Sequence, residues 1–280
     1  MTGCSVIMVS YHTGAVLFQA IEHVLAQKNL SELIVVDNGN PPDVLARLRA
    51  LPVRLVSGHG NIGFAGGCNL GASYATAEYI LLLNPDCLPE QDALVHLKAA
   101  LEANPDAMMA GGLLLNPNGT EQRGGRRQLL TPQTALSEAL GLYRFTGAAR
   151  LNNNETPTPQ QICEVPAISG ACMFLRREDY LKLGGMDEGY FLHVEDMDLC
   201  WRVHAAGEKI LFVPEARVVH LLSTSEAPAP FIEWCKAKGF MRYFHKYFSH
   251  GAWCLLLLPL YAAILLRAAL RMLAPRRKTR

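Results

Sequence analysis

The segment Tyr79-Ile80-Leu81-Leu82-Leu83-Asn84-Pro85-Asp86 decides the fold class of this chain. Its first five residues form an apolar run that ends at a turn sequence, which indicates a strand buried on both faces. Strands of this kind belong to parallel sheets that helices cover on both sides. The segment therefore predicts an open α/β domain, with a polar turn at the end of this strand.

The residues before this strand repeat the same alternation of short apolar runs and helix-length segments. The runs predicted as strands are Ser5–Ser10, Leu33–Val36 and Val53–Val56. The helical patterns between them lie at 14–27, at 43–50 and after Gly63. Strands that alternate with helices are typical of a mostly parallel sheet flanked by helices.

Polar turns follow three of the predicted strands. Tyr11 and His12 follow the first strand, Asp37 follows the second, and Asn84 and Asp86 follow the strand at 79–83. Open α/β sheets bind their ligands at the carboxyl ends of the strands. One polar turn can simply end a strand, but three on the same edge favour a ligand site.

The second half of the chain changes character. Residues 114–162 are rich in Asn, Gly, Pro, Thr and Gln, and we expect a long irregular insertion with a helix near 133–143. The elements predicted after it are strands at Cys163–Ser169, Ala171–Leu175, Ile210–Val213 and Arg217–His220, and helices near 177–183 and 195–206. The expected organisation is one domain over 1–230, with halves 1–113 and 114–230, and an extension over 231–280.

The extension combines aromatic, basic and apolar segments. Residues 231–248 mix aromatic with Lys and Arg side chains, as a basic amphipathic helix does, and 252–266 is uncharged and mostly apolar. Fifteen apolar residues are fewer than the roughly twenty that span a bilayer, so a helix in the membrane interface is expected. The alternative is a core helix that caps the domain. Basic residues crowd the end of the chain: Arg267, Arg271, Arg276, Arg277, Lys278 and Arg280.

Composition limits the class of protein. Half of the 280 residues are hydrophobic and 18% are charged, which excludes disorder over most of the chain. A net charge of +1 gives no general case for nucleic-acid binding. Eight scattered cysteines without a C-x-x-C pair predict buried free thiols in a reducing compartment. No signal-peptide pattern is evident, so a cytoplasmic protein is expected.

A glycine-rich segment at 58–71 lies where a loop is predicted to enter a helix. Glycines at such a junction let the backbone approach a ligand, and the N–H groups of a helix start favour an anion such as a diphosphate. The segment matches neither the G-x-x-x-x-G-K-[ST] nor the G-x-G-x-x-G motif. A purely structural tight turn is the alternative.

Two further groups of residues are candidates for metal or acid–base chemistry. Asp86 and His220 both follow apolar strands and together suit a divalent cation, although N-P-D is also an ordinary turn and a lone histidine is usually structural. Glu195, Asp196 and Asp198 crowd a predicted helix start, where the helix dipole favours carboxylates. Beside the other polar turns, a general base becomes the favoured interpretation, with Asp198 structural.

Taken in order, these motifs resemble family-2 GT-A glycosyltransferases, especially the rhamnosyltransferase-like branch that builds bacterial surface polysaccharides. The matching pieces run from Val6 to about Ser225: V-S-Y, V-V-D-N, N-x-G-F-A-G-G-x-N-x-G, L-L-N-P-D, S-G-A-x-x-x-x-R, G-G-M-D-E-x-Y-F, E-D-x-D-L-C-x-R and V-x-H. Each piece is weak alone, but their order and spacing are specific. The resemblance implies a GT-A fold with a nucleotide-sugar half at 1–113, an acceptor half at 114–230 and membrane-associating helices at 231–280.

The resemblance also implies the residues that bind the nucleotide sugar. Asp37 matches the aspartate that binds the pyrimidine base, and Tyr11 is expected to lie along the nucleotide. Asn61, Gly63 and Asn69 match the glycine-rich nucleotide-sugar loop. His12 stands where an asparagine usually follows V-S-Y, which is a departure from the family pattern.

The metal and base residues follow from the same resemblance. Asp86 matches the last aspartate of the metal-binding D-x-D, and His220 matches a histidine that shares the Mg²⁺ or Mn²⁺ ion. Asn84 replaces the first aspartate, which removes one charged ligand, and is expected on the nucleotide-sugar side. Asp196 matches the general base, and Glu195 beside it is expected to assist it or contact the acceptor.

The implied function is inverting transfer of a sugar, with rhamnose favoured, to a saccharide or lipid-linked acceptor at the inner face of the cytoplasmic membrane. The donor favoured by resemblance is dTDP-rhamnose, and a UDP-sugar is the alternative. A sugar-nucleotide pyrophosphorylase would need a basic loop after the first strand, which Ser10–Gly14 lacks. The alternative is a catalytically impaired scaffold that binds nucleotide or membrane. Asn84 in place of an aspartate favours this alternative, whereas the intact Asp86, Glu195 and Asp196 argue against it.

Overall fold

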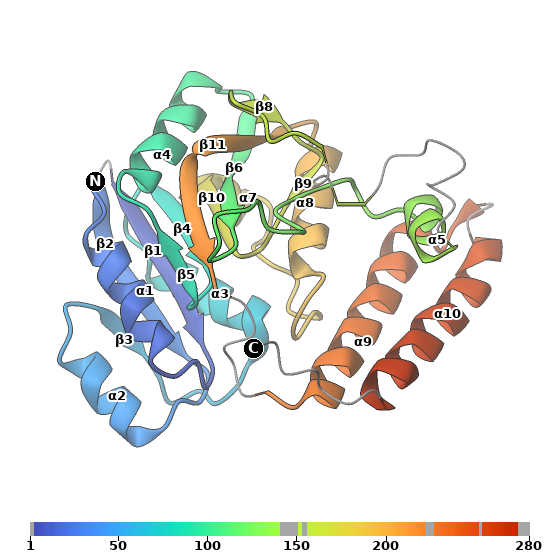
Figure 1. The fold of residues 1–280 in the computed structure, drawn as a ribbon, viewed down its shortest axis with the longest axis horizontal. Coiled ribbons are helices and arrows are strands. Elements are labelled where there is room, and N and C mark those ends of the chain that lie inside the picture. The colour runs from blue at the N-terminus through green and yellow to red at the C-terminus, as the bar shows by residue number, and fades with distance from the viewer. Residues whose placement is uncertain (1–2, 141–150, 153–155, 222–226, 252–253, 274–280) are drawn as a thin grey trace.

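The computed structural model describes residues 3–140, 151–152, 156–221, 227–251 and 254–273 (Figure 1). The basic residues at 276–280 and residues 141–143 of the expected helix lie outside the described residues.

The first half of the chain forms a parallel sheet. Strand β1 (Cys4–Ser10) lies between β2 (Leu30–Asp37) and β4 (Tyr79–Leu83), and β3 (Arg54–Val56) extends the sheet beyond β2. The connecting helices are α1 (Val16–Leu25), α2 (Pro42–Arg49) and α3 (Gly63–Tyr74). These elements confirm the predicted alternation.

Helices cover both faces of this sheet, as the apolar strands predicted. Successive side chains of a strand point to opposite faces. Val6 and Met8 therefore join the core under α1 and α2, whereas Ile7 and Val9 join the core under α3. Burial on both sides explains why the strands are continuously apolar.

The second half of the sheet is mixed. Strand β10 (Cys172–Arg176) runs antiparallel between β4 and β6 (Ala107–Leu115), and β11 (Lys209–His220) runs parallel to β6. The short strands β5 (Cys87–Pro89) and β8 (Cys163–Glu164) pair antiparallel with β11. The sheet thus has the order β3-β2-β1-β4-β10-β6-β11-β5, with β8 also paired to β11.

Two predicted boundaries in this half are wrong. The strands expected at 210–213 and 217–220 form one strand, β11, whose register shifts between Val213 and Arg217. The strand expected at 163–169 is instead divided into β8 and β9 (Ala167–Ile168) on either side of Pro166, which has no N–H for a ladder. The helices α7 (Arg177–Lys182) and α8 (Glu195–Ala205) confirm the two helices predicted there.

The segment expected to be irregular contains short regular elements. Strand β7 (Arg126–Arg127) pairs with β9, and α5 (Pro132–Leu140) confirms the expected helix over its described residues. Helix α4 (Ala93–Ala103) and strand β6 precede this segment. The β7–β9 pairing holds the segment against the start of α8, which brings it to the candidate site.

The extension forms two long helices that lie side by side, α9 (Ala229–Phe248) and α10 (Cys254–Leu273) (Figure 1). Trp201 of α8 contacts Tyr243, Tyr247 and Phe248 of α9 through their rings. Beside them Asp198 is fully buried and accepts hydrogen bonds from four side chains: Tyr190, Arg202, Lys246 and Tyr247. Asp198 therefore joins α8 to α9, which agrees with the structural role expected for it.

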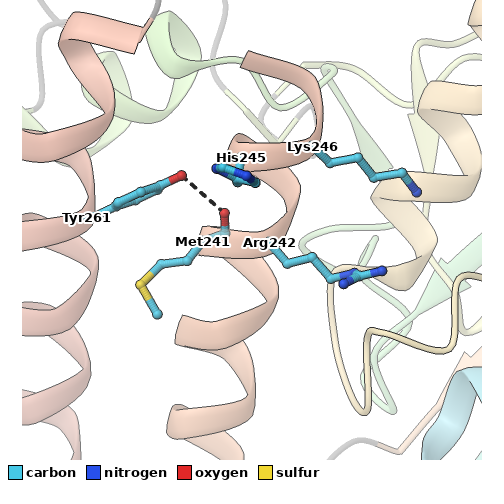
Figure 2. A pocket seen from close by; sticks show the side chains of 5 residues that line it. All are labelled: Met241, Arg242, His245, Lys246 and Tyr261. Atoms are coloured by element: carbon cyan, nitrogen blue, oxygen red, sulfur yellow. Dashed lines mark hydrogen bonds between the residues drawn. The ribbon is translucent and has the colours of Figure 1, made fainter. Parts of the chain in front are cut away.

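Between α9 and α10 lies a shallow pocket of about 600 Å³ (Figure 2). The Tyr261 hydroxyl donates to the Met241 carbonyl oxygen across it at 3.4 Å. Figure 2 shows Arg242 and Lys246 extending away from Tyr261, and both bind Asp187. Their charges thus tie α9 to the domain.

The length expected for the apolar segment is wrong. Helix α10 continues through Arg267 and Arg271 to Leu273, so it has 20 residues and is long and apolar enough to cross a membrane by length and composition. Only 17% of its most apolar window is buried, which disagrees with a core helix. Its most exposed large hydrophobic residues are leucines: Leu255, Leu258, Leu266, Leu270 and Leu273.

Candidate active site

A cleft of about 510 Å³ opens at the carboxyl ends of the central strands, where the polar turns predicted a ligand site. The predicted site residues that line it are Tyr11, Asn61, Gly63, Asn84, Asp86, Glu195, Asp196 and His220. They come from both halves of the domain, and α9 contributes one wall. The fold therefore brings most of the candidate residues into one space.

Asp86 and His220 form a buried pair at the base of the cleft. The Asp86 Oδ1 atom lies 3.2 Å from His220 Nε2, and Asn84 Nδ2 lies 3.4 Å from the same nitrogen. His220 ends β11 opposite Cys87 of β5, so the edge pairing of these strands fixes the distance. The predicted metal residues are thus neighbours.

Gln122 sets the orientation of His220. Its Oε1 atom lies 2.7 Å from His220 Nδ1, while its Nε2 donates to the His220 and Asn116 oxygens. Because that amide nitrogen is committed to oxygen acceptors, Gln122 Oε1 accepts the Nδ1 proton, and Nε2 is the ring nitrogen that faces Asp86. A second residue that orients a histidine in this way is a common feature of metal sites. Nothing in the sequence pattern indicated Gln122.

The donor atoms fit a divalent cation. Ligand atoms that are each about 2.1 Å from an ion lie roughly 3 Å from each other, as Asp86 Oδ1 and His220 Nε2 do. Cys87 offers a third donor atom within 4.8 Å of these two. Its thiol donates to the Ala171 carbonyl oxygen, and a soft sulfur suits Mg²⁺ poorly. Asp86 and His220 are therefore the better ligand pair.

Asp196 lies in the first turn of α8, and three donors hold its carboxylate. Oδ2 accepts from the Arg127 guanidinium and from the Gly170 N–H at 3.0 Å, and Oδ1 accepts from the Met197 N–H at 2.8 Å. Burial alone would raise the pKa of Asp196, but Arg127 and these N–H groups lower it below its ordinary value. Asp196 is therefore ionised, as a general base must be.

Glu195 has the opposite environment. Its side chain is buried, and its Oε2 atom has no hydrogen-bond partner among the described residues. Burial, followed by the negative charge of Asp196, raises the pKa of Glu195 to about 8. Two adjacent carboxyl groups in one cleft thus differ in protonation at neutral pH.

A strained turn presents these two residues. His193 has φ of +68° and Val194 φ of +75°, which is an unusual conformation for a β-branched residue. Helix α9 packs closely against the turn at Gly239. A Cβ at that position would lie only 3.0 Å from the His193 carbonyl oxygen. Burial and then Lys236 lower the pKa of His193 to about 4, which leaves it neutral and a weak base.

The glycine-rich segment has a structural role. Gly63 has φ of +79°, its N–H donates to Asn61 Oδ1 at 3.1 Å, and a Cβ there would lie 2.5 Å from the Phe191 carbonyl oxygen. A Cβ at Gly67 would meet Val9 of β1 at 2.6 Å. These glycines let α3 approach β1 and the 191–194 turn, while Asn61 and Gly63 still face the cleft.

Gly63→Ala is expected to lower the free energy of unfolding by about 1–3 kcal/mol, because alanine is strained at this φ and contacts Phe191. Chemical denaturation measures the effect. Gly207→Ala is the control for the φ alone, since Gly207 has φ of +80° and nothing within 4 Å of its built Cβ. Equal losses in both variants would show that the Phe191 approach does not matter.

Two predicted nucleotide-sugar residues lie outside the cleft lining. Asn69 bonds to Tyr180, Met186 and Glu188, so its amide joins α3 to the 184–188 loop. The expected contact of Asn69 with a nucleotide sugar stays a prediction. Asp37 Oδ1 accepts from the N–H groups of Gly39 and Asn40, and thus shapes the turn after β2.

Helix α9 supplies site residues that the sequence patterns missed. Phe231, Ile232 and Lys236 line the cleft, and Phe231 meets Phe191 edge to face with 5.7 Å between ring centroids. The sequence pattern places these residues only in a membrane-associating extension, because contacts across the chain leave no local pattern. The sequence pattern of the segment at 114–162 likewise assigned no role to Arg127.

Comparisons with known proteins agree with this geometry. A family model described as "Glycosyl transferase family 2" matches residues 5–184. An N-acetylglucosaminyl-diphospho-decaprenol L-rhamnosyltransferase of Mycobacterium tuberculosis is 28% identical over 250 residues, which are 80% of this chain and 78% of that protein. Rhamnosyltransferase WbbL of Escherichia coli K12 is 27% identical over 172 residues, which are 58% of this chain and 61% of that protein.

Solved structures share the fold. GalNAc-T7 with UDP, GalNAc and Mn²⁺ superposes with a TM-score of 0.64 at 17% identity, over 89% of this chain and 49% of that one. The mannosyltransferase PcManGT of Pyrobaculum calidifontis, with GDP-Man and Mn²⁺, gives a TM-score of 0.59 at 18% identity, over 95% and 75% of the two chains. The expected GT-A fold is therefore confirmed.

Proposed function

We propose that this chain, which belongs to glycosyl transferase family 2 and is a glycosyltransferase, inverts the configuration at the anomeric carbon of the sugar that it transfers. The acceptor is a saccharide or a lipid-linked saccharide used in cell-surface polysaccharide synthesis. One observation supports this best: the Asp86–His220 pair and the ionised Asp196 line the same cleft.

The donor is a nucleoside-diphosphate sugar, with dTDP-rhamnose favoured over a UDP-sugar. The support for rhamnose is that both bacterial relatives described above are rhamnosyltransferases. Tyr11, Asn61, Gly63 and Asn84 line the same cleft as the metal pair, which suits the nucleotide and its diphosphate. Asp37 acts through the turn that it organises beside Tyr11.

Asp86 and His220 would hold a Mg²⁺ or Mn²⁺ ion. When bound, such an ion stabilises the negative charge that develops on the departing nucleoside diphosphate. Asn84 contributes a neutral amide beside this pair, so the site has one negative charge fewer than a D-x-D motif would provide. Gln122 orients the His220 ring so that Nε2 faces Asp86.

Asp196 is the general base of the transfer. Its ionised carboxylate accepts the proton of the acceptor hydroxyl while that oxygen attacks the anomeric carbon from the face opposite the diphosphate. The bond from the anomeric carbon to the diphosphate oxygen breaks, and its electron pair leaves with the nucleotide. One displacement of this kind inverts the configuration.

The wall formed by α9 suits the acceptor. The aromatic pair Phe191–Phe231 offers an apolar surface, and Lys236 offers a positive charge that Glu233 partly neutralises. The same helix lies beside α10 (Figure 1). Helix α10 exposes several leucines. This continuity supports a protein associated with the inner face of the cytoplasmic membrane and a lipid-linked acceptor.

Truncation after residue 250 is expected to move the protein from the membrane fraction to the soluble fraction, because it removes the leucine surface of α10. The full-length variant Leu258→Ser/Leu266→Ser/Leu270→Ser should weaken binding to anionic vesicles in the same direction. Leu181→Ser is the matched control, since Leu181 is an exposed leucine on α7. Unchanged partition of the truncated chain would contradict membrane association through α10.

A donor panel tests the proposed activity. Release of nucleoside diphosphate from dTDP-rhamnose and UDP-sugars is measured with Mn²⁺ and with a chelator. Release that depends on the metal and is fastest with dTDP-rhamnose is expected. Faster release from a UDP-hexose would overturn the donor assignment, and release that is unchanged by the chelator would overturn the metal assignment.

A further inference from the structure

Arg127 links the segment after β6 to the start of α8. The antiparallel pairing of β7 with β9 sets Arg127 opposite Ala167 and close to Gly170. From there its guanidinium binds Asp196 Oδ2 and donates to the Ile168 carbonyl oxygen. The side chains of Arg127 and Asp196 are 17% and 13% exposed, so solvent screens this ion pair weakly.

The two adjacent carboxyl groups at this helix start are unequal in their partners. Asp196 has Arg127, the Gly170 N–H and the Met197 N–H, whereas the buried Glu195 Oε2 has no hydrogen-bond partner among the described residues. A buried carboxylate without a partner is costly to ionise, and a second negative charge beside it adds to that cost. One proton shared by the pair therefore belongs on Glu195.

The other groups near Glu195 do not reverse this placement. Asp198, on the same helix, is negative but is bound by Arg202 and Lys246. Cys68 of α3 is fully buried, which raises the pKa of its thiol well above the ordinary value and keeps it neutral. Arg127 is the positive group that faces Glu195 from β7, and Asp196 binds it.

We propose that Arg127 is a positioning residue that keeps Asp196 ionised and so leaves a proton on Glu195, whose neutral carboxyl group donates a hydrogen bond to a sugar hydroxyl in the cleft. This inference rests on the proposed transferase function. It assigns a role to a residue outside the catalytic motifs and divides the two carboxyl groups into a base and a hydrogen-bond donor.

The proton count of the reaction follows from this division. The acceptor O–H bond breaks as its oxygen bonds to the anomeric carbon, and the proton goes to Asp196. The electron pair of the broken sugar–phosphate bond leaves with the nucleoside diphosphate. Glu195 keeps its proton throughout, and Asp196 returns its proton to solvent when the products leave.

The pH dependence of stability tests the proton on Glu195 without any enzyme assay. The pKa of Glu195 in the folded protein is raised to about 8, above its ordinary value, so its protonated form favours folding at low pH and this contribution is lost as pH rises toward 8. Glutamine does not ionise. The Tm of Glu195→Gln minus that of the wild type should therefore increase from pH 5 to pH 8 and then level off.

The matched control is Glu22→Gln, an exposed position on α1. Its Tm difference from the wild type should stay flat over the same pH range. A flat difference for Glu195→Gln as well would overturn the placement of the proton. If the Tm difference for Glu195→Gln rises with pH but the wild type releases no nucleoside diphosphate, the proton on Glu195 is supported. Only the proposed transferase function is then contradicted.

Activity tests the roles of both residues. Glu195→Gln, which keeps a hydrogen-bond donor, should remain within about tenfold of the wild type, whereas Glu195→Ala, which lacks the donor, should lose on the order of 10²-fold. Arg127→Met should move the acid limb of the kcat/KM profile to higher pH, because Asp196 loses its cation, and Arg127→Lys should restore part of the shift. Arg49→Met, an exposed arginine on α2, is the control.

Two results would overturn the proposal. The first is equal inactivation by Glu195→Gln and Glu195→Ala, since an ionised Glu195 would then be required. The second is an acid limb in Arg127→Met at the wild-type pH. If Arg127→Met fails to fold, the acid limb of Arg127→Lys and the Tm series on Glu195→Gln still test the proposal.

Discussion

Asp196→Asn is expected to lower sugar transfer by about 10²–10⁴-fold, the usual contribution of a positioned general base. The amide keeps the size of the side chain and can still accept from the Gly170 N–H, but it has no basic oxygen for the acceptor proton. Nucleotide-sugar binding should survive, because Asp86, His220 and Asn61 are unchanged. Steady-state transfer and equilibrium binding of the nucleoside diphosphate measure the two effects separately.

The control for this substitution is Asp43→Asn, an exposed aspartate in the first turn of α2. Transfer by that variant should equal that of the wild type. Near-wild-type transfer by Asp196→Asn would remove Asp196 as the base and leave the cleft without its central assignment. Loss of nucleotide binding together with transfer would instead indicate a structural defect.

Asp86→Asn is expected to lower metal-dependent turnover on the order of 10²–10³-fold, because metal-ion stabilisation of the departing charge contributes several kcal/mol. The variant should also need more Mn²⁺ for half-maximal rate. Gln122→Leu should weaken metal affinity by about 10–100-fold, which is less than the loss of affinity expected for Asp86→Asn. The reason is that Gln122→Leu removes no ligand and only frees the His220 ring to reorient. Mn²⁺ binding by calorimetry gives a readout that is independent of turnover.

A metal site elsewhere in the protein would give a different result. Asp86→Asn would then bind Mn²⁺ as tightly as the wild type. Asp43→Asn again serves as the control for the loss of one acidic charge. The order expected for metal affinity is wild type, then Gln122→Leu, then Asp86→Asn.

The first half of the fold was predictable because local sequence patterns indicate its strands and helices. The central residues of β1, β2 and β4 are apolar because helices cover both faces of these strands, and that pattern is visible in the sequence. Strand β6 has the sequence Ala-Met-Met-Ala-Gly-Gly-Leu-Leu-Leu, whose small residues have little strand propensity. Its place between β10 and β11 comes from long-range pairing.

The site was predictable in part. Each polar residue at a strand end was visible as a turn, and the shared edge of the sheet brings Tyr11, Asn84 and His220 into one cleft. Gln122 and Arg127 were not predictable, because their positions depend on how the segment after β6 packs. Asn69 stands within a glycine-rich motif but serves the contact with the 184–188 loop.

The C-terminal helices show a second limit of local patterns. The sequence of α9 indicates a basic amphipathic helix, but not that one of its faces reaches the cleft through Phe231 and Lys236. The apolar run ends at the first arginine, whereas α10 continues for about two more turns with Arg267 and Arg271 inside it. Charges at the end of a helix did not end the helix.

The measurement that tests the central claim most directly is the anomeric configuration of the product. ¹H NMR of the transferred sugar, made by the wild type with Mn²⁺ and a lipid-linked saccharide acceptor, reports that configuration. A single displacement with Asp196 as base predicts the configuration opposite to that of the donor. Retention of the donor configuration would contradict the account, because it would require a second displacement that an Asp196 base does not provide.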